Sequence, residues 1–132
     1  MDSSDARATI AAALAQAASE GKRVAVVFGA SWCPDCDAFN SVLGHRLVAP
    51  VVGPNFVVVK VSVGDRNQNL DVMEEYGMNV DSGIPAVAVL EPDGSLVAAQ
   101  REGEFRNASD LLSVAEIVSF FQRWVPAKSA AG

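Results

Sequence analysis

The order of hydrophobic and polar residues along the chain predicts helices and strands that alternate. Continuous apolar runs at 23–28 and 56–63, rich in β-branched residues, are typical of strands buried on both faces. Apolar residues three or four positions apart near both ends of the chain predict helices. The pattern indicates helices at about 5–19, 33–48, 69–76 and 110–125, and strands at 23–28, 56–63, 85–90 and 95–100.

Capping and turn signals set the boundaries of these elements. Gly21 is expected to end the first helix, and Ser109 to cap the last one. Pro34 falls in the first turn of the second helix, where its missing N–H costs nothing. We expect turns at 53–55 (Gly-Pro-Asn) and at 91–94 (Glu-Pro-Asp-Gly), the second of which joins the last two strands into a hairpin.

Strands that alternate with helices predict parallel pairing, with helices on both faces of the sheet. The closing hairpin adds an antiparallel edge. We therefore expect a single α/β domain over residues 1–132, with an ordered core at about 5–125 and a flexible tail at 126–132.

Composition excludes several classes of function. Half of the 132 residues are hydrophobic, which is enough for one packed core. The formal net charge is −6 and the ten basic residues are scattered, which argues against a nucleic-acid partner. No apolar run approaches the roughly 20 residues that a membrane helix needs, so no membrane association is expected. We expect a monomer.

The two cysteines, Cys33 and Cys36, carry the candidate chemistry. A disulfide between them would close a very small loop and would remove little unfolded-state entropy. Its expected use is therefore reversible chemistry rather than stability. The pair lies between a buried strand and the start of a helix, where unpaired N–H groups and the helix dipole favour a negative charge.

A thiolate at that point is stabilised, and the thiolate is the species that attacks a disulfide. We expect Cys33, as the first helical residue, to be the exposed attacking thiol. Cys36, one turn further along, is expected to be more buried and to act as the resolving thiol.

The motif Trp32-Cys33-Pro34-Asp35-Cys36 after an apolar strand, with Gly83-Ile84-Pro85 before a later strand, resembles the thioredoxin family. The resemblance covers about residues 21–124 and is to the bacterial thioredoxin-like branch. It implies a thioredoxin-like α/β fold: a central four-stranded mixed sheet, flanked by helices on both faces, without the family's usual first strand. It also implies a thiol–disulfide oxidoreductase, acting as a protein-disulfide reductase.

In that family the proline is cis and faces the two sulfurs. A cis Ile84–Pro85 bond would expose the Ile84 backbone beside the cysteines, so that an extended substrate could pair with it as an extra strand. An ordinary trans proline at the start of a strand is the alternative. Trp32 is expected to pack over the motif and to line the groove.

The sequence departs from the family pattern in the surroundings of the cysteines. The family's buried acid on the preceding strand is replaced by Val27, which puts a proton relay to the resolving cysteine in doubt. Lys60 matches a basic residue of the neighbouring strand, or is a strand-edge lysine with its head in water. An insertion at 79–82 is expected to border the substrate groove.

Asp35 is a second departure, because typical thioredoxins carry Gly-Pro between the cysteines. Its charge opposes a thiolate and interacts favourably with the helix N-terminus. Our hypothesis is that Asp35 makes Cys33 harder to ionise and the couple more reducing. Alternatively, Asp35 only occupies the first turn of the helix.

Other chemistries fit the sequence less well. A metal site needs about four ligands, and His45 lies twelve positions after Cys33, roughly 18 Å along a helix. The same separation excludes a Cys–His dyad. We therefore expect no metal and no bound cofactor, because the sulfurs of a redox-active Cys33–Cys36 disulfide would carry the electrons. His45 is expected to be a solvent-facing helix residue.

The expected partners are disulfide-containing proteins and an external reductase or thiol protein. The rival reading is a thioredoxin-fold binding or partner-delivery module with little catalytic turnover, since a fold alone establishes no activity. The missing acid at Val27 favours the rival, and the two intact cysteines favour the enzyme. The expected compartment is the cytoplasm, or the periplasm if an export signal has been removed.

Overall fold

A computed structural model of the protein describes residues 3–100, 104–105 and 113–126. The expected cap at Ser109, the start of the last helix and most of the expected tail lie outside these ranges. The helices are α1 (Ser3–Glu20), α2 (Pro34–Leu43), α3 (Ala49–Asn55), α4 (Leu70–Glu75), the 3₁₀ turn η1 (Val80–Ser82) and α5 (Ser113–Arg123). The strands are β1 (Arg23–Gly29), β2 (Phe56–Ser62), β3 (Ala86–Leu90) and β4 (Leu96–Ala99).

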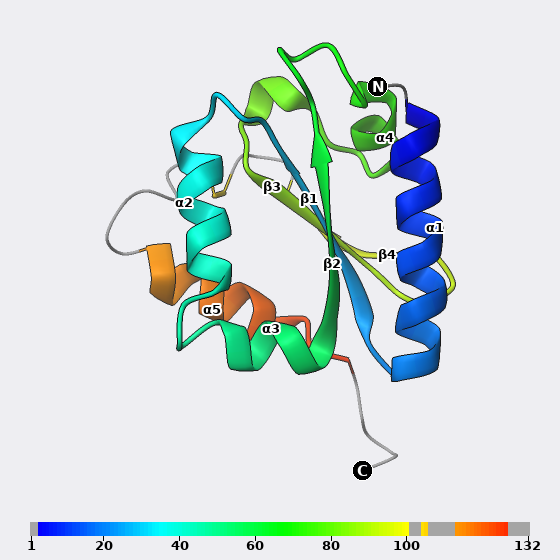
Figure 1. Cartoon of the computed structure of the whole chain (residues 1–132), viewed down its shortest axis with the longest axis vertical. Helices are drawn as coiled ribbons and strands as arrows, with labels where there is room; N and C mark the ends of the chain where they lie inside the picture. Colours follow the sequence, from blue (N-terminus) through cyan, green and yellow to red (C-terminus); the bar gives the residue numbers. More distant parts are fainter. Residues whose placement is uncertain (1–2, 101–103, 106–112, 127–132) are drawn as a thin grey trace.

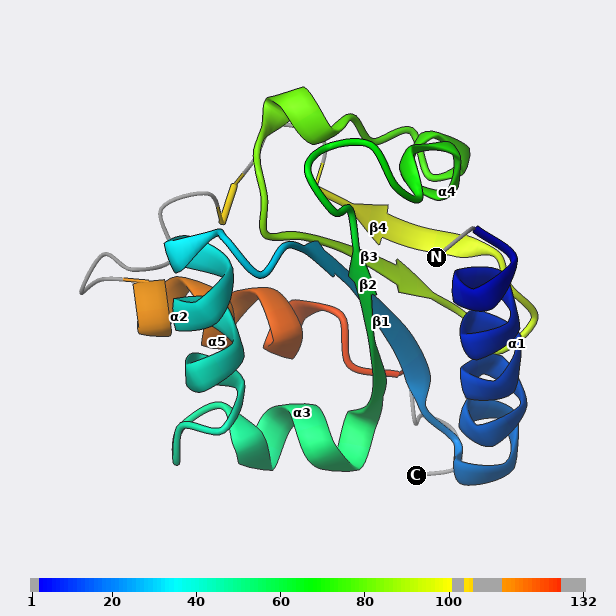
Figure 2. The same ribbon diagram turned by 45° about the horizontal axis from the view of Figure 1, so that its top comes forward.

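The four strands form one mixed sheet in the order β2-β1-β3-β4 (Figure 1). Helix α1 covers one face of the sheet, and α2, α3 and α5 cover the other (Figures 1 and 2). The expected four-stranded mixed sheet between helical layers is confirmed. The hairpin of β3 and β4 is also as expected, with Gly94 at φ 91° donating to the Glu91 carbonyl over 2.8 Å.

The expectation of mainly parallel pairing is wrong. Strand β1 pairs in parallel only with β2, and it pairs antiparallel with β3. A parallel β3 would have to begin at the end of the sheet where β1 begins, but the β2–β3 connection, with the six-residue helix α4 and the turn η1, stays at the opposite end (Figure 1). The chain therefore does not return to the start of β1, and β3 enters the sheet where β1 and β2 end.

The sheet separates two hydrophobic cores. Successive residues of β1 point to opposite faces, so that Val26 packs under α1 and Val27 packs under α2 and α5. All five residues of β3 are buried, as are Val24 to Phe28 of β1. Because the central strands are covered on both sides, the loop that leaves the end of β1 is held in place between the two layers.

The segment after α2 differs from the prediction. The expected helix to about residue 48 ends at Leu43, and the expected turn at 53–55 belongs to α3. Pro50 lies in the first turn of α3, and the Asn55 side chain donates to the Val51 carbonyl over 2.8 Å. The buried side chain of Val52 anchors this short helix to the core, which outweighs the turn preference of its Gly-Pro-Asn sequence.

One arginine ties three segments together at the end of the sheet where β1 begins. The Arg23 guanidinium donates to both carboxylate oxygens of Glu91, over 3.2 and 2.9 Å, and to the Trp124 carbonyl over 3.0 Å. Such a forked arrangement is the strong form of an arginine–carboxylate pair. It fixes the end of α5 and the β3–β4 hairpin to the first residue of β1.

Across the described part of the chain, every helix is too short or too polar to cross a membrane.

Candidate active site

The two cysteines lie at the junction of β1 and α2, and Cys33 is the cap of α2 rather than its first helical residue. Its backbone is extended, with φ −95° and ψ 110°, and Pro34 opens the helix. This corrects the prediction, because a residue before proline is driven out of the helical region. The Cys33 carbonyl accepts the N–H groups of Cys36 and Asp37, each over 3.1 Å, and so begins the helix.

The Cys33 sulfur occupies the position of a capping oxygen. It accepts the backbone N–H of Cys36 over 3.2 Å, and its thiol donates to the Ile84 carbonyl over 3.8 Å. Both cysteines are free thiols in this structure. A negative charge on the Cys33 sulfur would receive a backbone hydrogen bond and face the positive end of the helix dipole.

Both sulfurs are covered, contrary to the expectation of an exposed Cys33. Cys33 is 5% exposed and Cys36 is 4% exposed, so the two differ little. Cys33 belongs to the core cluster on the α1 side, together with Ile84, which is itself buried. The segment that carries Ile84 therefore covers Cys33, a contact across 51 positions that local patterns do not reveal.

Burial raises the pKa of Cys36 to about 12. A hydrogen bond with Cys33 and the negative charges of Cys33 and Asp35 act in the same direction, whereas a backbone hydrogen bond from Ala30 lowers it. Asp35 is half-buried in the first turn of α2. Near neutral pH, Cys36 is thus a neutral thiol. Gly29 leaves room for it, because a Cβ there would lie 3.2 Å from the Cys36 sulfur.

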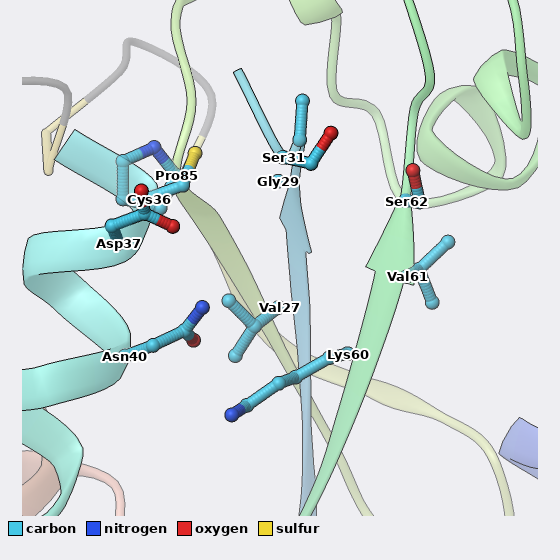
Figure 3. A pocket seen from close by; sticks show the side chains of 11 residues that line it. Val27, Gly29, Ser31, Cys36, Asp37, Asn40, Lys60, Val61, Ser62 and Pro85 are labelled. Carbon is cyan, nitrogen blue, oxygen red and sulfur yellow. The ribbon is translucent and has the colours of Figure 1, made fainter. Parts of the chain in front are cut away.

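A pocket of about 260 Å³ extends below Cys36 between α2, β1 and β2 (Figure 3). Val27 forms part of its wall, so the pocket has no acid at that strand position. Lys60 is the register partner of Val27 on β2, and its exposed side chain reaches across β1 toward Asn40 of α2. Asp37, also exposed, lines the same space.

The loop before β3 faces the cysteines through its backbone. The Ile84–Pro85 peptide bond is cis, and Pro85 lines the pocket below Cys36. Gly83 has φ 127°, a conformation that favours glycine. The insertion at 79–82 forms η1, capped by an Asn79 side chain that accepts the Asp81 N–H over 2.8 Å.

The Trp32 side chain contacts the loop between β2 and α4. It is 44% exposed, and its indole N–H donates to the Gly64 carbonyl over 2.7 Å. The Arg66 guanidinium lies 5.0 Å from the centre of the indole ring. Sequence reasoning missed Gly64 and Arg66, because only the fold brings the β2–α4 loop beside the motif.

His45 is also not where it was expected. It follows the end of α2, is half-buried, and its Nδ1 accepts the Leu47 N–H over 3.1 Å. The helix that was to present it to solvent stops at Leu43.

A dithiol at the start of a helix, facing a cis-proline loop across the end of a mixed sheet, is the arrangement of thioredoxin-fold proteins. Residues 5–92 match the thioredoxin-like family, and the chain belongs to that family. It is similar to a disulphide isomerase from Xylella fastidiosa Temecula1, with 35% identity and a TM-score of 0.83 over 90% of each chain.

Two further proteins are similar to this chain, one at lower identity and the other over a shorter stretch. A thioredoxin from Thermus thermophilus has 27% identity and a TM-score of 0.62, over 91% of this chain and 85% of that one. Tryparedoxin from Trypanosoma brucei brucei is 42% identical over 57 residues, which are 43% of this chain and 38% of tryparedoxin. The matched stretch therefore spans less than half of that relative.

The raised pKa of Cys36 predicts slow alkylation. In the Cys33→Ser variant at pH 8, Cys36 should react with iodoacetamide at least about tenfold more slowly than the same cysteine in guanidinium chloride, because little thiolate forms. Mass spectrometry of timed samples measures the rate. The Cys36→Ser variant, which keeps Cys33, serves as the control. Equal rates for folded and unfolded Cys36 would contradict the assignment.

Proposed function

We propose that this protein is a thiol–disulfide oxidoreductase that reduces disulfides of protein or small-molecule substrates. The observation that carries the proposal is the Cys33 sulfur at the cap of α2. It accepts the Cys36 N–H over 3.2 Å and lies 3.8 Å from the Ile84 carbonyl. A thiolate there is stabilised by the helix and stands beside the backbone that would receive a substrate.

The exchange proceeds in two displacements. The Cys33 thiolate attacks one sulfur of the substrate disulfide, and the other substrate sulfur leaves as a thiolate and takes up a proton. Cys36 then loses its proton and attacks the Cys33 sulfur, which releases the second substrate thiol. The substrate gains two electrons, and the protein is left with a Cys33–Cys36 disulfide. An external reductase or thiol protein returns the electrons, without a bound cofactor.

The proton of Cys36 is proposed to leave through the pocket below it. The pocket volume of about 260 Å³ exceeds the roughly 30 Å³ share of one water molecule several times over. The strand offers Val27 instead of an acid, and the charged side chains that line the pocket are Asp37 and Lys60. In this proposal the Asp37 carboxylate accepts the proton through water, and the Lys60 ammonium stabilises the thiolate that remains.

A binding or partner-delivery module is the second candidate, and the burial of both thiols together with Val27 favours it. Such a module would use the same groove to hold a partner without repeated turnover. The proposed compartment is the cytoplasm, or the periplasm if an export signal has been removed.

Catalysis of insulin reduction by dithiothreitol separates the two functions. The wild type should accelerate the reaction, Cys33→Ser should abolish the acceleration, and Cys36→Ser should accumulate a mixed disulfide at Cys33. Turbidity and non-reducing mass spectrometry give the two readouts. A wild type with no acceleration over dithiothreitol alone would favour the binding module.

The proposed proton route predicts a defect confined to the second displacement. When the reduced protein reacts with Ellman's reagent, the first released thiolate reports attack by Cys33 and the second reports resolution by Cys36. Asp37→Asn should slow the second phase about tenfold or more near neutral pH, and less as the pH rises, because hydroxide then removes the proton. Lys60→Gln should slow the same phase.

Glu116→Gln, which removes an exposed acid on α5, is the matched control for the stopped-flow measurement. If Asp37→Asn leaves the second phase as fast as in this control, the pocket is not the route.

The Asp35 hypothesis predicts a change in reduction potential. Asp35→Asn should raise the potential of the Cys33–Cys36 couple by about 10–30 mV, because loss of the negative charge stabilises the thiolate of the reduced form. Equilibration in glutathione buffers of known ratio measures the potential. An unchanged or lowered potential would show that Asp35 merely occupies the first turn.

A further inference from the structure

An exposed cation stands over the tryptophan that precedes Cys33. The Arg66 guanidinium carbon lies 5.0 Å from the centre of the Trp32 ring, a distance typical of a cation–π contact. The hydrogen bond from the indole to the Gly64 carbonyl, 2.7 Å long, fixes the ring to the loop that carries the arginine. Trp32 and Arg66 therefore form one unit at the rim of the redox site.

Hydrogen bonds within the β2–α4 loop fix the backbone that carries Arg66. The Val63 carbonyl accepts the N–H groups of Asn67 and Gln68, each over 3.1 Å. Gly64 has φ 58°, and a Cβ there would lie 2.8 Å from the Asn67 side-chain oxygen. The loop folds tightly on itself, and its bond to Trp32 joins it to the motif.

Arg66 itself adopts a left-handed backbone conformation, with φ 64°. That region is unfavourable for a residue with a Cβ, and the contact of the side chain with the indole offsets part of the cost. Among the described residues Arg66 enters no ion pair, whereas the guanidinium groups of Arg7 and Arg23 both contact carboxylates. The positive charge is thus available to an incoming group.

Arg66 is a cation on a molecule whose net charge is negative. Asp65 precedes it in the loop, Asp35 lies in the first turn of α2, and the whole chain carries a net charge of −6. An anionic substrate is repelled by the molecule as a whole, so its approach to the sulfurs depends on the local cation.

We propose that Arg66 is a specificity-determining residue that favours disulfides with a carboxylate close to the attacked sulfur. This inference rests on the proposed function. A guanidinium receives a carboxylate through two parallel hydrogen bonds, and the exposed indole beside it offers an apolar face to the methylene groups between carboxylate and sulfur. Trp32 immediately precedes Cys33 in the chain. In this proposal, a short chain between carboxylate and sulfur lets the disulfide of a substrate held by Arg66 reach the attacking sulfur.

Two small disulfides of opposite charge test the proposal. The reduced protein is mixed with 3,3′-dithiodipropionate, which carries two carboxylates, or with cystamine, which carries two ammonium groups. The second-order rate of dithiol loss is measured by acid quench and mass spectrometry. Arg66→Gln should lower the rate ratio of dithiodipropionate to cystamine about fivefold at low salt, and by less at high salt.

Two further variants serve as controls. Arg66→Lys keeps the charge and should keep most of the wild-type ratio. Arg46→Gln removes an exposed arginine beyond the far end of α2 and should leave the ratio unchanged.

Three outcomes count against the proposal. An unchanged ratio in Arg66→Gln overturns it, even if both rates fall because the loop is disturbed. An equal fall of the ratio in Arg46→Gln overturns it as well, since the effect would then reflect net charge alone. If the wild type reduces insulin but neither small disulfide, this inference fails and the proposed function stands; if it does not reduce insulin either, the proposed function fails and this inference fails with it.

Discussion

The hydrogen bond from the Cys36 N–H to the Cys33 sulfur is the contact on which the site depends. It exists because Pro34 drives Cys33 out of the helix, so that the cysteine caps α2 instead of joining it. The same hydrogen bond brings the two cysteines of the motif together and aims a backbone donor at the charge that disulfide exchange requires. The buried strands β1 and β3 hold the two sides of this arrangement, the helix start and the Ile84 carbonyl.

The pair is chemically asymmetric even though its two members are equally buried. The Cys33 sulfur caps α2 and accepts the Cys36 N–H, whereas burial and nearby negative charge raise the pKa of Cys36 in spite of its backbone hydrogen bond from Ala30. In the proposed exchange, a resolving thiol that stays protonated does not compete for the substrate, but it must lose its proton later. The pocket below Cys36 has Asp37 and Lys60 in its wall, and in the proposed mechanism these two side chains assist the loss of that proton. The strand itself carries Val27 at this position and no acid.

Local patterns predicted most elements and the position of the dithiol, because strand runs such as 23–28 and the Cys-X-X-Cys spacing are local signals. They failed where distant contacts decide the outcome. The burial of Val52 holds the Gly-Pro-Asn sequence in α3, and the β2–β3 connection stays at one end of the sheet, so that β3 runs antiparallel to β1. Ile84, 51 positions away, contacts the Cys33 sulfur and buries it. The contact between Trp32 and Arg66 cannot be predicted from the motif either, because Arg66 lies in a distant loop.

The contacts of Arg23 with Glu91 and Trp124 indicate where the protein could be immobilised or fused to another domain. The guanidinium holds the end of α5 against the first residue of β1, while the dithiol follows the last residue of that strand. Seven strand residues, about 23 Å, separate the two ends. A bead, a surface or a fused domain linked just after α5 would therefore sit at the opposite pole from the sulfurs and leave their approach unobstructed.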